Sequence, residues 1–205
     1  MAELNQNMPT NAITATSHTR KGNRMEKEYI STADTAKLVR QCLKESFPQI
    51  KFTVRSSVYS GGSNIRIGWT DGPTEKQINE IVSQFAGSGF DSMVDLKYNR
   101  YAEFDGKPVS FGADYIFTNR NYSDTMIESA IAAIQSEFGC KNCPTVEDYK
   151  EGRAYQFPVI ENNHSYPWEF QSQISKTLCE TSLTESLPSK TANRTVFTHD
   201  DSPRS

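Results

Sequence analysis

Apolar and polar residues alternate along the chain in patterns that predict a helix followed by a β-hairpin. The segment ISTADTAKLVRQCLKESFP has apolar residues at helical spacing, with Ser31 or Thr32 as the expected N-cap and Pro48 as the stop. The stretch IKFTVRSSVYSGGSNIRIGW then alternates with a period of two on both sides of Gly61 and Gly62. Such alternation around a glycine pair is typical of two antiparallel strands joined by a tight turn.

The second half of the pattern adds two helices and a strand. Thr74 is the expected cap of a second helix that ends near Gly87, and Ser123 the cap of a third. Residues 90–108 mix aromatic and charged side chains without a clean period, and we interpret them as a loop or partial strand. Between them and Ser123 a third strand is predicted, with these residues on one side: Val109, Phe111, Ala113, Tyr115 and Phe117. The predicted fold is a single small α+β domain, an antiparallel hairpin plus a third strand packed by three helices in the order α-β-β-α-β-α.

The two ends of the chain are poor in large apolar residues. Hydrophobic residues make up 36% of the chain, below the roughly 45–50% apolar content of ordinary globular proteins. Residues 1–26 and the Ser/Thr-rich residues 166–205 account for this deficit. We therefore predict disordered tails at 1–26 and 166–205 around a packed domain at 27–165.

Charge and targeting signals narrow the function classes. The chain has a net charge of −3, and none of its regions has the positive excess that nonspecific duplex binding requires. No apolar run resembles a secretory signal or a membrane span, so we expect a cytoplasmic protein without a membrane partner. The four cysteines do not suggest a disulfide framework.

The predicted hairpin gathers a polar face. If Tyr59 lies opposite Asn64, then Ser57 lies opposite Arg66 and Arg55 opposite Gly68, where the missing side chain would let the guanidinium lie flat. Phe52, Val54 and Val58 would then face the core together with Ile65, Ile67 and Trp69. The other face would carry the candidate binding residues Arg55, Ser57, Tyr59, Asn64 and Arg66. Two forked donors beside a tyrosine suit a carboxylate, a phosphate or a stacked base.

This face also has a purely structural interpretation. A hairpin packed on one side exposes its other side to water, where arginines are solvated or pair with carboxylates such as Asp114. Gly61 and Gly62 fit a tight turn, and no Gly-Lys-Ser or Gly-Lys-Thr follows to indicate a phosphate loop.

Two further groups of residues are candidate metal or redox sites. Cys140 and Cys143 have the spacing of half a zinc site, which His164 and Cys179 could complete only if the C-terminal segment folds back. Their position after a helix also disfavours thioredoxin-like chemistry, and we predict no cofactor. The acidic residues of 90–108 would have to converge around a cation or beside the arginines to make a metal-dependent enzyme: Asp91, Asp95, Glu103 and Asp105. With the histidines in or next to the two ends, no catalytic pair is evident.

The stretch YISTADTAKLVRQCLKESFPQIKFTVRSSVYSGGSNIRIGWTDGPT, with the later FDSMVDL, resembles the large polyvalent protein-associated domain numbered twenty-nine. The resemblance is carried by residues 29–96, where the motif includes Arg55, Ser56, Gly61, Gly62, Arg66, Trp69, Asp71, Gly72 and Pro73. It implies an accessory of a phage, plasmid or integrated element, often found beside counter-defence functions. It carries over no catalytic residue.

The sequence therefore predicts a non-enzymatic binding module of a mobile element. Its arginine-bearing face would contact a host or element-encoded macromolecule, with a protein as the first expectation. The alternative is a protein that binds single-stranded or structured nucleic acid, with Tyr59 stacking on a base while the arginines reach phosphates.

Overall fold

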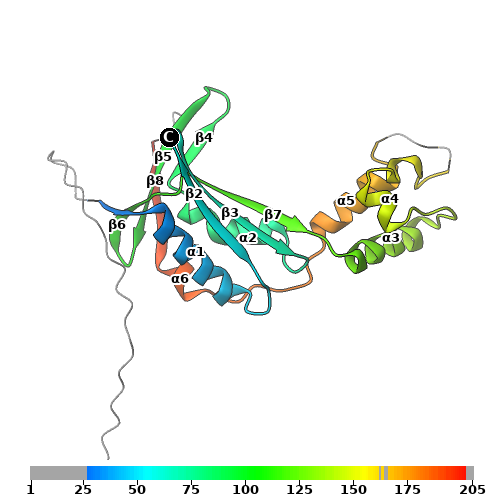
Figure 1. Cartoon of the computed structure of the whole chain (residues 1–205), viewed down its shortest axis with the longest axis horizontal. Helices are drawn as coiled ribbons and strands as arrows, with labels where there is room; N and C mark the ends of the chain where they lie inside the picture. Colours follow the sequence, from blue (N-terminus) through cyan, green and yellow to red (C-terminus); the bar gives the residue numbers. More distant parts are fainter. Residues whose placement is uncertain (1–26, 162, 164–165, 202–205) are drawn as a thin grey trace, which may run out of the picture.

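The computed structural model describes residues 27–161, 163 and 166–201. The predicted tail at 1–26 lies outside the described residues. The α+β class is confirmed, and the predicted helices and strands are present together with additional ones (Figure 1). In chain order the elements are β1 (Glu28–Ile30), α1 (Thr32–Ser46), β2 (Thr53–Tyr59), β3 (Gly62–Thr70), α2 (Glu75–Val82), β4 (Ser88–Asp91), β5 (Leu96–Phe104), β6 (Lys107–Phe111), β7 (Tyr115–Asn121), α3 (Asp124–Phe138), α4 (Val146–Lys150), α5 (Phe170–Glu180), α6 (Lys190–Asn193) and β8 (Thr195–Asp200).

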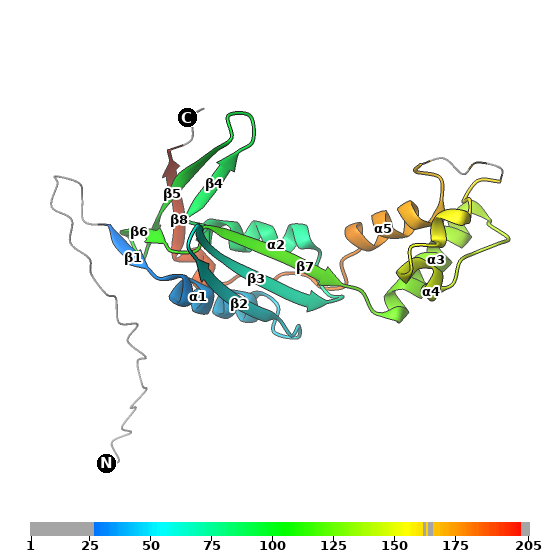
Figure 2. The same ribbon diagram turned by 45° about the horizontal axis from the view of Figure 1, so that its top comes forward.

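A three-stranded sheet in the order β2-β3-β7 forms the centre of the molecule. The antiparallel pair β2 and β3 is the predicted hairpin, and β7 lies parallel to β3 on its other side. Figure 2 shows α1 along β2 and α2 along β7. Buried residues of both helices and of the strands form one hydrophobic cluster, which contains Leu43, Ile65, Ile67, Trp69 and Ile78. Both helices therefore cover the same face of the sheet.

The helix starts follow the capping residues that the sequence indicates. Ser31 is the N-cap of α1, where its hydroxyl accepts a hydrogen bond from the Asp34 N–H at 3.2 Å. Thr74 and Gln77 form a capping box at the start of α2, with the Thr74 N–H donating to Gln77 Oε1 at 2.8 Å. Each cap satisfies backbone N–H groups that a helix end leaves without partners.

The predicted third strand is wrong in one respect, because residues 109–120 form two strands rather than one. The chain bends at Gly112, whose N–H donates to the Ile30 carbonyl at 2.7 Å. A Cβ at this position would lie 2.8 Å from the Thr32 nitrogen. The start of α1 therefore crosses here, and the bend ends β6 before β7 begins. Tyr115 and Phe117 consequently do not share a side with Val109 and Phe111.

Residues 90–108, predicted as a loop or partial strand, belong instead to a second sheet. This sheet has the order β1-β6-β5-β4, and β8 also pairs with β5. A turn with positive φ at Asp105 and Gly106 joins β5 to β6. The β4–β5 hairpin projects from the body (Figures 1 and 2), so its apolar residues are exposed and show no alternation between a core and a solvent side: Phe90, Met93, Val94 and Leu96.

The third helix does not pack on the sheet as predicted. Instead α3 packs against α5 and α4 in a separate helical lobe at the other end of the molecule (Figure 1). A second hydrophobic cluster fills this lobe, with Ile127, Ile131 and Ile134 from α3 and Ile174 and Leu178 from α5. The stripe on α3 was identified correctly, but the partner that covers it comes from the segment that we predicted to be unpacked.

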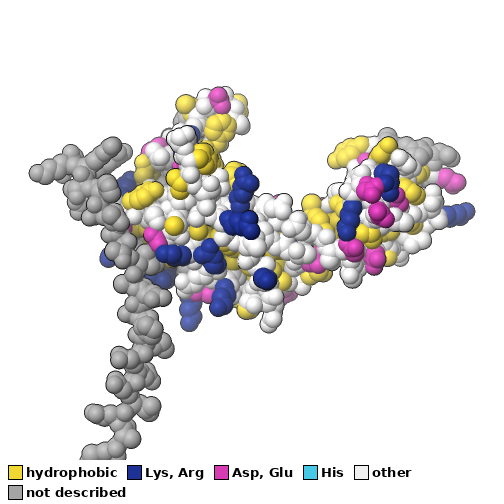
Figure 3. Space-filling view, in the orientation of Figure 1, with side chains coloured by type: hydrophobic (Ala, Val, Ile, Leu, Met, Phe, Trp, Pro, Cys, Tyr) yellow, Lys and Arg dark blue, Asp and Glu magenta, His cyan; other side chains and the backbone are white. Residues whose placement is uncertain are grey.

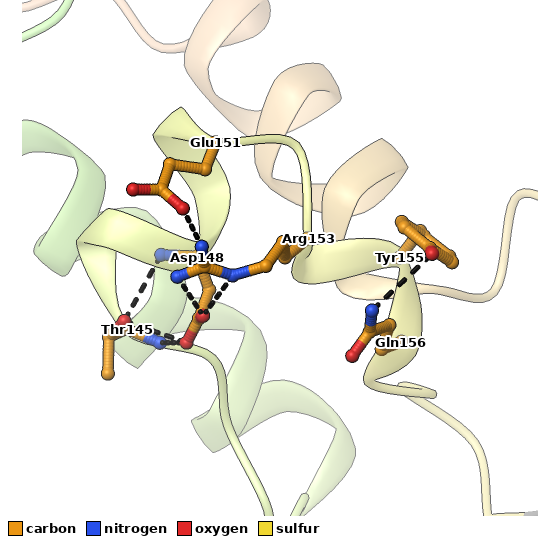
Figure 4. Close-up of polar contacts among 6 residues, drawn as sticks. All are labelled: Thr145, Asp148, Glu151, Arg153, Tyr155 and Gln156. Atoms are coloured by element: carbon orange, nitrogen blue, oxygen red, sulfur yellow. Dashed lines mark hydrogen bonds and ion pairs between the residues drawn. The ribbon is translucent and has the colours of Figure 1, made fainter.

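Polar contacts close the outer side of the helical lobe around α4. Thr145 and Asp148 form a capping box, and Asp148 also pairs with Arg153 at 3.0 Å, as Figure 4 shows. Arg153 contacts Glu151 as well. These side chains are partly exposed, so the contacts shape the loop after α4 and contribute little to stability.

The prediction of an unpacked C-terminal segment is wrong for the described residues after 165. Phe170, Ile174 and Leu178 recur at intervals of four and are almost fully buried in α5, a helical stripe that the surrounding serines and threonines obscure. Further along, α6 docks on α1 through Glu45, which accepts hydrogen bonds from the Thr191 N–H at 2.9 Å and the Ser189 hydroxyl at 2.7 Å. Residues of α5 and α6, from the segment predicted to be a tail, therefore belong to the packed structure.

Candidate functional site

The side of the β2-β3-β7 sheet opposite α1 and α2 carries all five predicted binding residues. We call it the open face. Side chains alternate between the two faces of a strand, so the positions between the buried Ile65, Ile67 and Trp69 point away from the helices. The open face comprises Thr53, Arg55, Ser57 and Tyr59 of β2, Asn64, Arg66, Gly68 and Thr70 of β3, and Tyr115, Phe117, Asn119 and Asn121 of β7.

The predicted register of the hairpin is wrong by two residues. The turn consists of Ser60 and Gly61 alone, so Tyr59 lies opposite Gly62 instead of Asn64. A shift of two keeps every side chain on its face, but it changes the partners. Gly68 lies opposite Thr53, whose hydroxyl donates to the Gly68 carbonyl at 3.1 Å. It therefore leaves no gap beside Arg55.

One predicted core position also fails at the end of the hairpin. Val58 is 74% exposed, whereas Val54 on the same strand is buried. The helix α1 packs along β2, but its cover does not extend to the hairpin turn. The apolar side of the hairpin is therefore narrower than the alternation indicates.

The corrected register places two arginines directly opposite each other. Arg55 pairs with Arg66 across β2 and β3, and both side chains are exposed. Like charges in this position destabilise a sheet by up to about 1 kcal/mol. Neither arginine has an ion pair with any residue that the structure describes. The three strands of the sheet contain three arginines and no acidic residue, so the sheet does not supply a balancing carboxylate.

Asp114, considered from the sequence as a partner for these arginines, has other partners. Its Oδ1 accepts from the Ser88 hydroxyl at 2.9 Å and pairs with Lys97 at 2.7 Å, and its Oδ2 accepts from the Ser63 N–H at 2.9 Å. Burial raises the pKa of Asp114, but the hydrogen bonds from Lys97, Ser88 and Ser63 outweigh it and lower the pKa below its usual value. Asp114 is therefore a charged junction between the two sheets.

Gly62 is required beside this junction. Its φ of 153° lies in a region that residues with a side chain seldom adopt, and a Cβ there would come 2.5 Å from Asp114 Oδ2. The same missing side chain leaves space for Tyr59, whose hydroxyl would lie 3.6 Å from that Cβ. The glycine pair thus serves the turn and the Asp114 junction.

The open face has two aromatic residues that the sequence places on one side of a single strand with Val109 and Phe111. Phe117 lies beside Arg66 in the sheet register and is 50% exposed. Tyr115 is its neighbour on the same face, with ring centroids 6.2 Å apart and planes 27° apart. Gly112 and Asp114 occupy the polar positions of the alternating run, so the pattern does not signal that the side of the strand changes here.

Asn64 lies in the row between Ser57 and Tyr115 and is 7% exposed. Its Oδ1 has no hydrogen-bond partner among the described residues. A buried polar atom without a partner costs about 1–3 kcal/mol. The open face therefore combines unpaired cations, exposed rings and an unsatisfied amide oxygen.

The other candidate groups are dispersed. Asp91 pairs in register with Leu96, whereas Glu103 lies seven positions further along β5, roughly 23 Å away at the usual rise of a strand. Asp105 instead pairs with Arg194. No group of three potential metal ligands occurs in the part of the chain that the structure describes.

The two cysteines after α3 are packed against the backbone. The Cys140 thiol donates to the Val159 carbonyl at 3.2 Å, and burial raises the pKa of both Cys140 and Cys143. Raised thiol pKa values disfavour redox chemistry. His164, the ligand proposed to complete a zinc site, lies outside the described residues.

Residues 30–123 match the model of the large polyvalent protein associated domain 29. This part of the chain is therefore similar to that family. The matched segment includes the whole open face and ends at Ser123, the N-cap of α3. The helical lobe, α6 and β8 lie outside it. No match was found among curated proteins or solved structures, and none of the helices in the described residues has the length and apolarity to cross a membrane.

Proposed function

We propose that the protein is a non-enzymatic binding module of a phage or plasmid, in which the open face holds an anionic surface of a host or element-encoded macromolecule. The observation that carries the proposal is the opposed pair Arg55 and Arg66, exposed and without a carboxylate partner among the described residues. A sheet gains nothing from two adjacent unpaired guanidinium groups, whereas a bound carboxylate or phosphate would satisfy both with forked hydrogen bonds.

The distribution of charged side chains over the molecule supports this role. In Figure 3 the view of the molecule shows Lys and Arg side chains spread over the part that holds the sheets, while Asp and Glu gather mainly on the helical lobe. A cationic surface next to an acidic one steers an anionic partner to the correct side. The similarity of residues 30–123 to the large polyvalent protein associated domain 29 supports a module of a mobile element. We place its action in the cytoplasm of a bacterial host, in counter-defence.

The test is site-specific photo-crosslinking in bacterial cells. A photo-reactive amino acid replaces Ser57, which is exposed on the open face between Arg55 and Tyr59. We expect the double variant Arg55→Ala and Arg66→Ala to lower the yield of crosslinked macromolecule at least about tenfold, because each charge-assisted hydrogen bond contributes about 1.5–3 kcal/mol. The yield is measured by gel shift of the tagged protein.

The matched control removes two exposed cations from the helical lobe, Lys141→Ala and Lys176→Ala. It changes the net charge equally and should leave the yield unaltered. Equal yields from the arginine variant and the lysine variant would refute a role for the open face.

A further inference from the structure

The open face offers flat rings next to its unpaired arginines. Phe117 lies beside Arg66 in the sheet register and is half exposed, and Tyr115 lies next to it with its ring inclined by only 27°. Tyr59 on the opposite strand is also 50% exposed. Two nearly parallel rings on a sheet surface form a platform on which planar groups can stack.

The same surface has no Val, Leu, Ile or Met side chain for a protein partner to bury. Apart from its rings, the open face has no large apolar side chain, since its remaining positions are Thr, Ser, Asn, Gly and Arg. Protein interfaces depend on a buried apolar centre. A ligand that combines planar rings with regularly placed anionic groups fits these residues better.

Asn64 supplies an independent observation in the same row of the sheet. It is more than nine-tenths buried, and its Oδ1 has no partner among the described residues. Tyr115 lies beside Asn64 in the same row and is partly exposed, so a donor group of a ligand on the platform would lie next to this oxygen. The amino group on the edge of an adenine or cytosine is such a donor.

We infer that the open face binds single-stranded nucleic acid, with bases stacked on Phe117 and Tyr115, phosphates on Arg55 and Arg66, and Asn64 accepting a hydrogen bond from a base edge. This inference rests on the function proposed above, of which it names the ligand. Only a single strand presents unstacked bases to a flat sheet. The net charge of −3 also disfavours binding of a duplex through phosphates alone.

The experiment measures fluorescence anisotropy of labelled 12-nucleotide single strands, as RNA and as DNA, and of the corresponding duplexes, over a salt series. We expect the full-length protein to bind single strands more tightly than duplexes, and the tighter of the RNA and DNA arms identifies the sugar. Arg55→Ala with Arg66→Ala should reduce the slope of log affinity against log salt by about 1.4, since each phosphate contact in a single strand contributes about 0.7.

Substitution of Phe117 in the platform separates the contribution of stacking to binding from that of charge. Phe117→Ala should weaken binding about tenfold or more without changing the salt slope, and Phe117→Tyr should retain binding. The control is Phe90→Ala, which removes a ring of similar exposure, 51%, from the β4–β5 hairpin and should have no effect. Asn64→Ala should reduce the differences in affinity among homopolymers. Circular dichroism and thermal unfolding verify that each variant is folded.

Three results would overturn the inference: no binding of single strands at low salt, equal binding of duplexes, or equal effects of Phe117→Ala and Phe90→Ala. If the crosslinked partner is a protein whose capture still requires Arg55 and Arg66, the proposed binding function stands and the nucleic-acid ligand is wrong. If no macromolecule is crosslinked and binding does not depend on Arg55 and Arg66, both the proposed function and the nucleic-acid ligand are wrong.

Discussion

Arginine side chains on the two faces of the three-stranded sheet differ in burial and in hydrogen bonding. On the covered face, Arg120 of β7 is 6% exposed and donates hydrogen bonds at 2.9–3.0 Å to the carbonyls of Asp71, Gly72, Leu178 and Thr181. On the open face, Arg66 lies one strand away and has no partner among the described residues. A side chain of the same chemistry serves the fold where its donors are saturated, and is available to a ligand where they are not.

The covered face also explains how the helical lobe is attached. Leu178 and Thr181 lie at the end of α5 and just beyond it, where unpaired carbonyls and the helix dipole favour a cation. Arg120 therefore joins the sheet, the turn after β3 and the helical lobe in one contact. No carboxylate is needed, because four carbonyl oxygens surround the guanidinium.

The two faces should differ most in how much their arginines contribute to the free energy of unfolding. Arg120→Ala should lower the free energy of unfolding by about 3 kcal/mol or more, because several buried carbonyls lose their donors at once. Arg66→Ala should change it by less than about 0.5 kcal/mol. Urea unfolding followed by circular dichroism measures both. Similar losses for the two variants would mean that the faces do not differ as described.

Glu45 is a carboxylate on the covered side whose oxygens, like the donors of Arg120, have hydrogen-bond partners within the protein. Burial raises the pKa of Glu45, but hydrogen bonds from the Thr191 N–H and the Ser189 hydroxyl outweigh it and bring the pKa to about 2. Because this value lies below the usual 4.5, the stabilisation is complete above about pH 4.5 and is lost as the pH falls toward 2.

We therefore expect Glu45→Gln to destabilise the protein by about 1 kcal/mol at pH 7, a value reduced for the partial exposure of the side chain. The difference from the wild type should decrease as the pH falls below 4.5 and vanish only below the folded pKa of about 2. Thermal unfolding at a series of pH values measures it. A difference that persists at acid pH would show that the hydrogen bonds, rather than the charge, hold α6 on α1.

The smallest change in stability is expected for a substitution on the open face, and it is a gain rather than a loss. Arg55→Glu places a carboxylate opposite Arg66, which should stabilise the hairpin by a few tenths of a kcal/mol and raise the melting temperature by about one degree. The same variant should lose the crosslinked partner. A variant that is more stable but inactive would show that the open face keeps its charges for a ligand; a destabilised variant would contradict the unpaired state of Arg66.

The sequence predicted the elements of this sheet and the face on which Arg55 and Arg66 lie, because a strand period of two is insensitive to a register error of two. It did not predict their direct opposition, which depends on a turn of only two residues. Phe117 was missed because the bend at Gly112 is fixed by contacts with the start of α1, a tertiary effect that periodicity does not record. The buried stripe of α5 was missed because serines and threonines dilute it.

The role of Arg120 could likewise not be predicted from the sequence. Its position in an alternating strand indicates only which face it occupies, whereas its partners come from a turn about 50 residues earlier and a helix about 60 residues later. Pairings over such separations are set by packing, and nothing local to the arginine signals them.

The carbonyl groups around Arg120 limit where the matched segment can be separated from the rest of the chain. The match to the family model ends at residue 123, yet Leu178 and Thr181 lie beyond that boundary. A fragment excised at the boundary would expose a guanidinium deprived of half its carbonyls. In such a fragment, hydrogen-bond acceptors from another segment would be needed in place of the carbonyls at the end of α5.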